Sequence, residues 1–208
     1  MSNIHAVVLN CSLKPSNETS NTQALIDESL KIFEKEKVSY EIVRLVDYNI
    51  KYGITDDAGE GDEWPEIFNK VKAADILIIG TPLWLREKSS IAALAIERLY
   101  GGSSLTNEKG QSIYYNKVGG TVITGNEDGA KNAAKSILYA LSHVGFTVPP
   151  NVDPYWVGDA GPGDSYIEAG GDEHEFTQNN IETMSYNLIH FARLLKEHPI
   201  PAEGNTME

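Results

Sequence analysis

Short apolar runs alternate with longer segments of helical periodicity along most of this 208-residue chain. Residues 4–9 and 76–80 are continuously apolar and rich in β-branched side chains, which is typical of strands buried on both faces of a sheet. Residues 40–45 and 117–124 predict two more strands. A fifth strand is expected within residues 147–157, where prolines interrupt the pattern.

The segments between these runs carry apolar residues at spacings of three and four, which is the period of an amphipathic helix. Helices are predicted over residues 20–37, 64–74, 89–100, 128–144 and 175–197. Strand and helix therefore alternate five times, which predicts an α/β fold with a parallel sheet and helices on both faces. We expect one domain over residues 1–198, a three-layer sandwich with the strand order 2-1-3-4-5 that is typical of flavodoxin-like sheets.

Two stretches of the chain show neither period. Residues 158–173, called the excursion below, are acidic and rich in glycine, and they are long for a connection in a compact domain. Three interpretations remain open for the excursion: a solvated surface loop, a flap over a site, or an arm that packs on a second subunit. Residues 199–208 predict a disordered tail.

The charge balance excludes several classes of partner. The formal net charge is −13, with 30 acidic and 17 basic residues. Since nucleic acids and anionic lipids are bound through basic surfaces, neither is expected as a partner. No run reaches the roughly 20 apolar residues of a membrane span, and the apolar stretch after Met1 lacks a basic leader. The single cysteine, Cys11, rules out an internal disulfide, so we expect a cytoplasmic protein.

Small and polar residues gather in three segments that each follow a predicted strand. They are the first segment (residues 10–22), the second segment (residues 81–84) and the third segment (residues 124–129). Open α/β sheets bind ligands at the edge formed by the carboxyl ends of their parallel strands. We therefore expect these three segments, which are distant in sequence, to form one pocket.

The first segment has the residues of a phosphate site. A helix is predicted to begin at its end, and the free amide groups and partial positive charge of a helix start favour phosphate. Hydroxyl, amide and ammonium groups are added by Ser12, Lys14, Ser20, Asn21 and Thr22. A single such residue suffices to cap a helix, so their number favours a ligand site over capping alone.

The second segment indicates contact with a flat ring. Pro82 fixes the backbone, so that the strand is not expected to continue past it. Leu83 and Trp84 follow at the edge of the sheet, where a tryptophan can stack on a planar ligand.

The third segment complements the second. Thr124 begins it, and Asn126 can bond to the polar edge of a ring. Gly125 and Gly129 have no side chain, which lets the backbone approach a flat ligand closely.

Taken together, these segments make the chain resemble the NAD(P)H-dependent FMN reductases of the flavodoxin-like superfamily over roughly residues 4–157. The resemblance rests on Asn10-Cys11-Ser12-Leu13-Lys14, on Thr81-Pro82-Leu83-Trp84 with Ser89-Ser90 and Glu97-Arg98, and on Thr124-Gly125-Asn126-Glu127-Asp128-Gly129-Ala130. Two positions depart from the family pattern. Cys11 stands where the family usually has glycine, and Arg86 stands where close relatives often have glycine.

The resemblance implies the cofactor and the reaction. FMN would bind to the residues singled out in the three segments, and NAD(P)H would pass hydride to the flavin. Electrons would then go to a small acceptor such as a quinone, another flavin, a nitro compound or a metal ion. Because the flavin carries the chemistry, no catalytic side chain is assigned. The resemblance also implies a homodimer or a higher homo-oligomer.

Other functions fit the sequence less well. A flavodoxin-type electron carrier, which would bind FMN without any substrate chemistry of its own, remains the main alternative. A phosphatase on a similar fold would use Cys11 as its nucleophile, but it needs an arginine six positions further on, where the chain has Asn17. The five histidines show no ligand spacing and no cysteine cluster exists, so no metal is expected.

Overall fold

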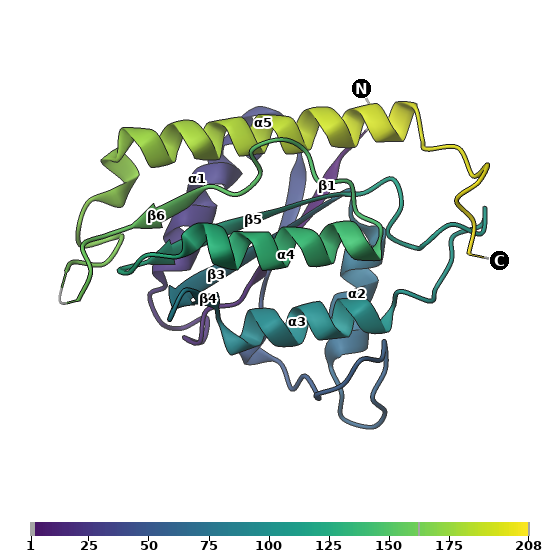
Figure 1. The fold of residues 1–208 in the computed structure, drawn as a ribbon, viewed down its shortest axis with the longest axis horizontal. Helices are drawn as coiled ribbons and strands as arrows, with labels where there is room; N and C mark the ends of the chain where they lie inside the picture. Colours follow the sequence, from purple (N-terminus) through teal and green to yellow (C-terminus); the bar gives the residue numbers. More distant parts are fainter. Residues whose placement is uncertain (1–2, 162, 208) are drawn as a thin grey trace.

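The computed structural model describes residues 3–161 and 163–207 and places a parallel sheet between two layers of helices (Figure 1). The parallel strands have the order β2-β1-β3-β5-β6. Their bounds are His5–Asn10 for β1, Ser39–Arg44 for β2, Ile76–Trp84 for β3, Val118–Gly125 for β5 and Tyr155–Val157 for β6. Apart from the short strand β4, this is the predicted order 2-1-3-4-5.

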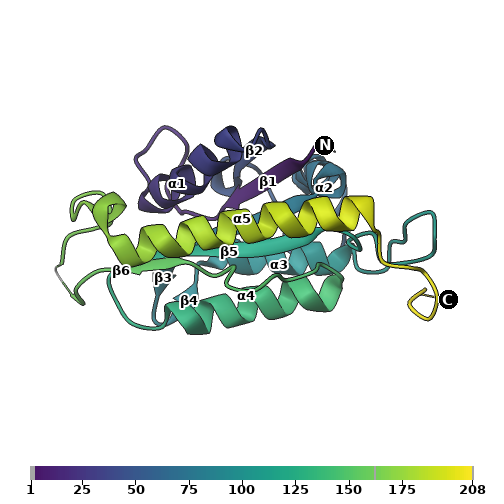
Figure 2. The same ribbon diagram turned by 90° about the horizontal axis from the view of Figure 1, so that it is seen from above.

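The helices divide between the two faces of the sheet, as Figures 1 and 2 show from two directions. One layer holds α1 (Asn21–Lys35) and α5 (Glu175–Glu197), and the other holds α2 (Trp64–Ala73), α3 (Ser90–Gly101) and α4 (Ala130–Val144). Alternate residues of β3 enter opposite layers: Ile76 and Ile78 pack with α1 and α5, while Leu77 and Ile79 pack with the other helices. The continuous apolar runs of the sequence are explained by this burial on both faces.

The third strand runs further than predicted. It continues through the second segment and turns back as the short antiparallel strand β4 (Glu87–Lys88). The prediction that Pro82 ends the strand is therefore wrong. Since β1 pairs with β3 only as far as Gly80, Pro82 has a paired strand, β5, on one side only. Proline has no N–H to donate and is tolerated at such an edge.

The turn between β3 and β4 explains one departure from the family pattern. Its two residues, Leu85 and Arg86, have φ angles of 52° and 65°. Positive φ at both positions is the conformation of a tight type I′ hairpin turn, which favours glycine or asparagine. Arg86 therefore has a left-handed backbone conformation that glycine adopts more readily than arginine.

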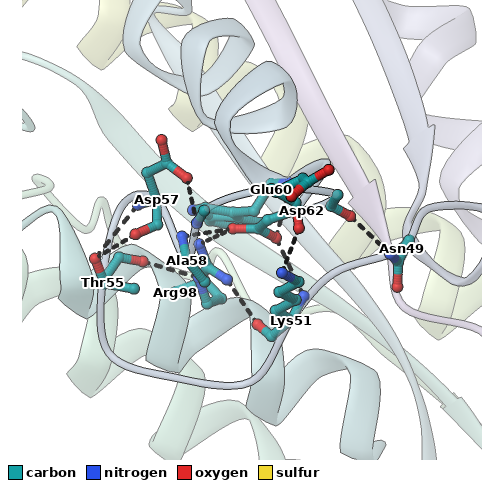
Figure 3. A network of polar contacts seen from close by, with 11 residues as sticks. Asn49, Lys51, Thr55, Asp57, Ala58, Glu60, Asp62 and Arg98 are labelled. Carbon is teal, nitrogen blue, oxygen red and sulfur yellow. Dashed lines mark hydrogen bonds and ion pairs between the residues drawn. The ribbon is translucent and has the colours of Figure 1, made fainter.

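A buried ion pair organises the segment between β2 and α2, which also contains the short helix η1 (Leu45–Asp47). The side chains of Arg98 and Asp62 are fully buried, with the guanidinium nitrogen 2.7 Å from the carboxylate (Figure 3). Arg98 also donates to the carbonyl groups of Lys51 at 2.6 Å and Thr55 at 2.8 Å. A turn-rich stretch without regular structure is thus fixed against α3.

The end of the chain follows an ordered path over residues 199–207. The amide of the buried Gln111 donates to the carbonyls of Ile200 at 3.2 Å and Pro201 at 3.1 Å and to the side chain of Asn205 at 3.0 Å. The N–H of Met207 donates to Gly110. This path differs from the expected disordered tail, because a distant side chain supplies the partners that the local sequence does not reveal.

Within the described part of the chain, no helix combines the length and the apolar character that crossing a bilayer requires.

Candidate functional site

A cavity of about 670 Å³ lies at the edge of the sheet where β1, β3 and β5 end. All three segments contribute to it. The predicted site residues that line it are Ser12, Lys14, Ser20, Asn21, Thr22, Pro82, Leu83, Trp84, Thr124, Gly125 and Asn126. The predicted convergence of three distant segments on one pocket is therefore present in the structure.

Gly129 is the predicted site residue that does not line the cavity. It precedes α4 with a φ of 107°, and a Cβ atom there would lie 2.5 Å from the Cβ atom of Arg86. The missing side chain makes room for the β3–β4 turn and not for a ligand. The prediction was a close approach of a flat ligand at Gly129, whereas the group that comes close in the structure is Arg86.

Gly125 lines the cavity and also joins two segments. A Cβ atom on Gly125 would lie 2.8 Å from the Cβ atom of Leu83. Glycine at this position therefore allows β3 and β5 to stay close where both strands reach the cavity.

The hydroxyl oxygens of Ser12 and Ser20 accept hydrogen bonds from the backbone of the first segment and of α1. Ser20 caps α1, since its Oγ accepts the N–H of Gln23 at 3.2 Å. Ser12 Oγ likewise accepts the N–H of Lys14 at 3.2 Å. Because both oxygens accept from the backbone, the hydrogens of both hydroxyls remain available for an anion. The first N–H groups of α1 have no partner within the helix, so capping by Ser20 leaves room for an anion at the helix start.

Buried hydrogen bonds fix the first and second segments relative to each other. Ser89, the residue that caps α3, donates from its hydroxyl to the carbonyl of Cys11 at 2.8 Å. Its N–H donates to the hydroxyl of Thr81 at 3.0 Å. These bonds hold the second segment, whose Pro82 and Trp84 line the cavity, beside the first segment.

Two asparagines of the predicted site bind the excursion. Asn126 donates from its side-chain amide to the carbonyls of Gly163 at 2.6 Å and Asp164 at 2.8 Å. Asn21 accepts the N–H of Ile167 at 3.0 Å. In this structure the Asn126 amide donates to the excursion and not into the cavity, so its predicted bond to a ring edge stays a prediction. Of the three interpretations of the excursion, these contacts support the one in which it covers the site.

Five further residues line the cavity without having been predicted as contacts: Leu13, Glu127, Trp156, Gly161 and Tyr166. Leu13 and Glu127 lie inside the recognised motifs. Trp156 stands in the predicted fifth strand, where prolines obscured the pattern. Tyr166 lies in the excursion and packs edge-on against Trp156, with ring centroids 5.6 Å apart. No local signal marks Tyr166, because its place depends on the excursion folding back.

The titratable groups at the site do not indicate a nucleophile. Burial raises the pKa of the Cys11 thiol well above its usual range, so the thiol stays protonated and unreactive. Burial also raises the pKa of Tyr166 to about 12. Among the described residues, no group of three or more His, Cys, Asp or Glu side chains is placed to hold a metal ion.

Comparison with known proteins identifies the family of this chain. Residues 4–159 match the family of NADPH-dependent FMN reductases, and the chain belongs to this family. The predicted family and the flavodoxin-like fold are thereby confirmed. The family is described by FMN and NADPH, so FMN and NAD(P)H are the cofactors that the match supports.

A curated relative and a solved structure carry names that concern flavins. The 8-demethyl-8-aminoriboflavin-5'-phosphate synthase of Streptomyces davaonensis is 41% identical over 205 residues, covering 94% of this chain and 80% of the relative. The crystal structure of RosB with bound 8-demethyl-8-formylriboflavin-5'-phosphate is 39% identical, with a TM-score of 0.88, covering 95% of this chain and 82% of that one.

A third relative is much longer than this chain. The divalent metal cation transporter MntH of Mycobacterium bovis is 44% identical over 199 residues. The match covers 93% of this chain and 29% of the transporter, so this chain spans less than a third of that relative's length.

The residues present fit FMN. Free hydroxyl hydrogens, the start of α1 and Lys14 suit a phosphate, while Pro82, Leu83 and Trp84 form an apolar wall for a ring. Both features lie in the same cavity.

Proposed function

We propose that this protein transfers electrons from NAD(P)H through bound FMN to a small acceptor such as a quinone, another flavin, a nitro compound or a metal ion. The observation that supports the proposal most directly is the composition of the cavity. Its anion-binding groups come from the first segment and its apolar wall comes from the second, and these segments lie far apart in sequence. A ligand with an anionic tail and a flat head matches both.

The proposed roles follow the position of each residue. Ser12, Lys14, Ser20, Asn21 and Thr22 hold the phosphate through side-chain donors, a cation and the first N–H groups of α1.

The wall of the cavity orients the ring. Pro82, Leu83 and Trp84 face one part of the flavin, and the backbone of Thr124, Gly125 and Asn126 borders another part. When bound, the flavin supplies the hydride-accepting and electron-donating chemistry. The contribution of the chain is to bind, to orient and to exclude water.

The test is turnover of NADH and NADPH by the FMN-loaded protein with a quinone, a nitro compound, free flavin or ferric ion present. Oxidation of either nucleotide that depends on the acceptor supports the proposal. FMN binding without turnover of either nucleotide would overturn it and leave a flavodoxin-type electron carrier or modification of the flavin itself.

A second candidate function is chemical modification of the flavin itself. It is favoured by the synthase and by RosB, which are 41% and 39% identical and whose names describe riboflavin phosphates altered at position 8. The flavin would then be a substrate that leaves the site as a product. Mass spectrometry of FMN recovered after incubation in air with amino donors separates the two functions. A changed flavin mass supports modification, and unchanged FMN with nucleotide turnover supports the reductase.

The oligomeric state is also a proposal. A homodimer or higher homo-oligomer is implied by the family resemblance, and the β3–β4 turn exposes apolar side chains beside the cavity: Trp84 is 47% exposed and Leu85 is 85% exposed. Light scattering coupled to size-exclusion chromatography tests it, and a monomeric mass at micromolar concentration would contradict it.

A further inference from the structure

Arg44 is the last residue of β2 and lies behind the first segment. Its guanidinium donates to the carbonyls of Lys14 at 2.8 Å and Pro15 at 3.2 Å. These two contacts hold the backbone of the first segment from the side of β2. Arg44 itself does not line the cavity.

Side-chain hydrogen bonds also connect Arg44 indirectly to Ser12, at the other end of the same stretch. The guanidinium of Arg44 lies 3.4 Å from the side-chain oxygen of Gln23, and that oxygen also accepts from Asn10 at 2.8 Å. Asn10 in turn accepts the N–H of Ser12 at 3.0 Å. Arg44 therefore connects to both ends of the stretch 12–15, which contains two of the proposed phosphate contacts.

In the ranges that the structure describes, Arg44 has no ion pair within 4 Å, and the nearest acidic contact on the same segment is the Asp47 carboxylate, which accepts the N–H of Ser16 at 3.1 Å. Of the four arginines, Arg86, Arg98 and Arg193 each lie within 4 Å of a carboxylate oxygen, at 2.7, 2.7 and 3.2 Å. No described carboxylate pairs with Arg44, and its Nε is buried without a hydrogen-bond partner. In a chain with a net charge of −13, this half-buried cation favours an anion at the first segment.

We propose that Arg44 is a positioning residue that makes the site selective for phosphorylated flavins over flavins without a phosphate. It acts through the backbone of the first segment and through its unpaired charge. The inference rests on the proposed FMN site and adds a determinant of ligand specificity to it. The hydrogen bonds of Arg44 do not involve the apolar wall of Pro82, Leu83 and Trp84. Loss of Arg44 is therefore expected to weaken binding of the phosphate and to leave the contacts with the ring unchanged.

The test compares the dissociation constants of FMN and riboflavin, measured by fluorescence titration, for the native protein, Arg44→Met and Arg44→Lys. Arg44→Met removes both the support of the segment backbone and the nearby positive charge, so it is expected to raise the Kd of FMN about 10- to 100-fold, which corresponds to about 1.4–2.8 kcal/mol of binding free energy. The Kd of riboflavin is expected to stay the same. Arg44→Lys keeps the charge but loses the planar fork, so it restores part of the FMN affinity.

Arg193 offers a matched control. It also donates to a backbone carbonyl, that of Glu36 at 3.1 Å, and its Nε is also buried without a partner. Arg193 lies near the C-terminal end of α1, away from the cavity. Arg193→Met is expected to lower the melting temperature and to leave the ratio of the two dissociation constants unchanged.

The outcomes separate the inference from the function on which it rests. If the native protein binds FMN and Arg44→Met weakens FMN and riboflavin equally, or weakens neither, the inference is overturned and the FMN site stands. If the native protein does not bind FMN, the proposed function fails and the inference fails with it. Should Arg44→Met not fold, Arg44→Lys decides, since an unchanged ratio in that variant also overturns the inference.

Discussion

The hydroxyl oxygens of Thr22 and Thr124 lie 2.9 Å apart, although 102 residues separate them in the sequence. Both side chains are buried, and both line the cavity. Their hydrogen bond joins the start of α1 to the end of β5, and so it joins the first segment to the third. Since one hydrogen is shared between the two oxygens, the other hydroxyl hydrogen remains for a ligand.

Removal of one member of this pair should cost more than removal of both. Thr124→Val keeps the shape but leaves the Thr22 hydroxyl without its protein partner, so the free energy of unfolding should fall by about 1–3 kcal/mol. The double variant with Thr22→Val replaces both partners by apolar groups and should recover part of this loss. Urea unfolding of the single and double variants measures the coupling, and strictly additive losses would contradict a direct contact.

A negative charge at Ser12 should act against the phosphate. Ser12→Asp places a carboxylate among the proposed phosphate contacts, and like charges at short range in a partly buried site should raise the Kd of FMN at least about tenfold. Asn17→Asp is the matched control, because Asn17 is exposed in the same segment and does not line the cavity. Equal effects of the two variants in a flavin titration would move the phosphate away from Ser12.

The contacts of Asn126 predict control of flavin release by the excursion. Asn126→Ala removes both hydrogen bonds to the excursion, so the rate of FMN dissociation and the rate of proteolytic cleavage in the excursion should both rise. Asn180→Ala, which removes an amide–carbonyl bond to Phe176 on α5, serves as the control. An unchanged dissociation rate in stopped-flow fluorescence would show that these contacts do not limit release.

The Arg98–Asp62 pair predicts a loss of stability in acid. Burial alone would raise the pKa of Asp62, but the Arg98 guanidinium and three backbone N–H groups outweigh it and lower the pKa to about 2. Because this folded-state pKa lies below the unfolded value near 3.8, the contribution is fully present above about pH 4. It is lost as the pH falls toward 2.

Asp62→Asn tests this account. The variant leaves the Arg98 charge buried without a counter-charge and should lose about 3–5 kcal/mol of unfolding free energy at neutral pH. Its stability should also fall less steeply between pH 4 and 2 than that of the native protein, as measured by urea unfolding at each pH. Parallel pH profiles would indicate that Asp62 does not titrate with the fold.

Much of the fold follows from local periodicity. The apolar runs and the helical spacing predicted the strands and helices, because both patterns reflect burial of neighbouring residues. The strand order was expected from the crossover rules and from the order typical of flavodoxin-like sheets. The extension of β3 past Pro82 escaped prediction, since it depends on β1 having ended at Gly80. The turn at Arg86 escaped for the same reason, because the left-handed conformation of this residue is set by strand pairing and not by its own preference.

The site was predictable where residue type determines chemistry. Hydroxyls, a lysine and a helix start after a strand favour phosphate, which is why Ser12 and Ser20 were predicted, and both line the cavity. The sequence did not predict that Tyr166 lines the cavity or that Asn126 binds the excursion. Both contacts depend on the excursion folding back to the cavity from a distant part of the chain. At Gly129 the sequence indicates that a side chain is excluded. It does not indicate that the group that comes close is Arg86.

The most direct measurement is a titration of the purified protein with FMN, followed by the absorption spectrum of the flavin and by the melting temperature. The account predicts saturable binding of one FMN per chain, with a shifted flavin spectrum and a melting temperature that rises with FMN concentration. A flavin spectrum and a melting temperature that both stay unchanged at saturating FMN would contradict it.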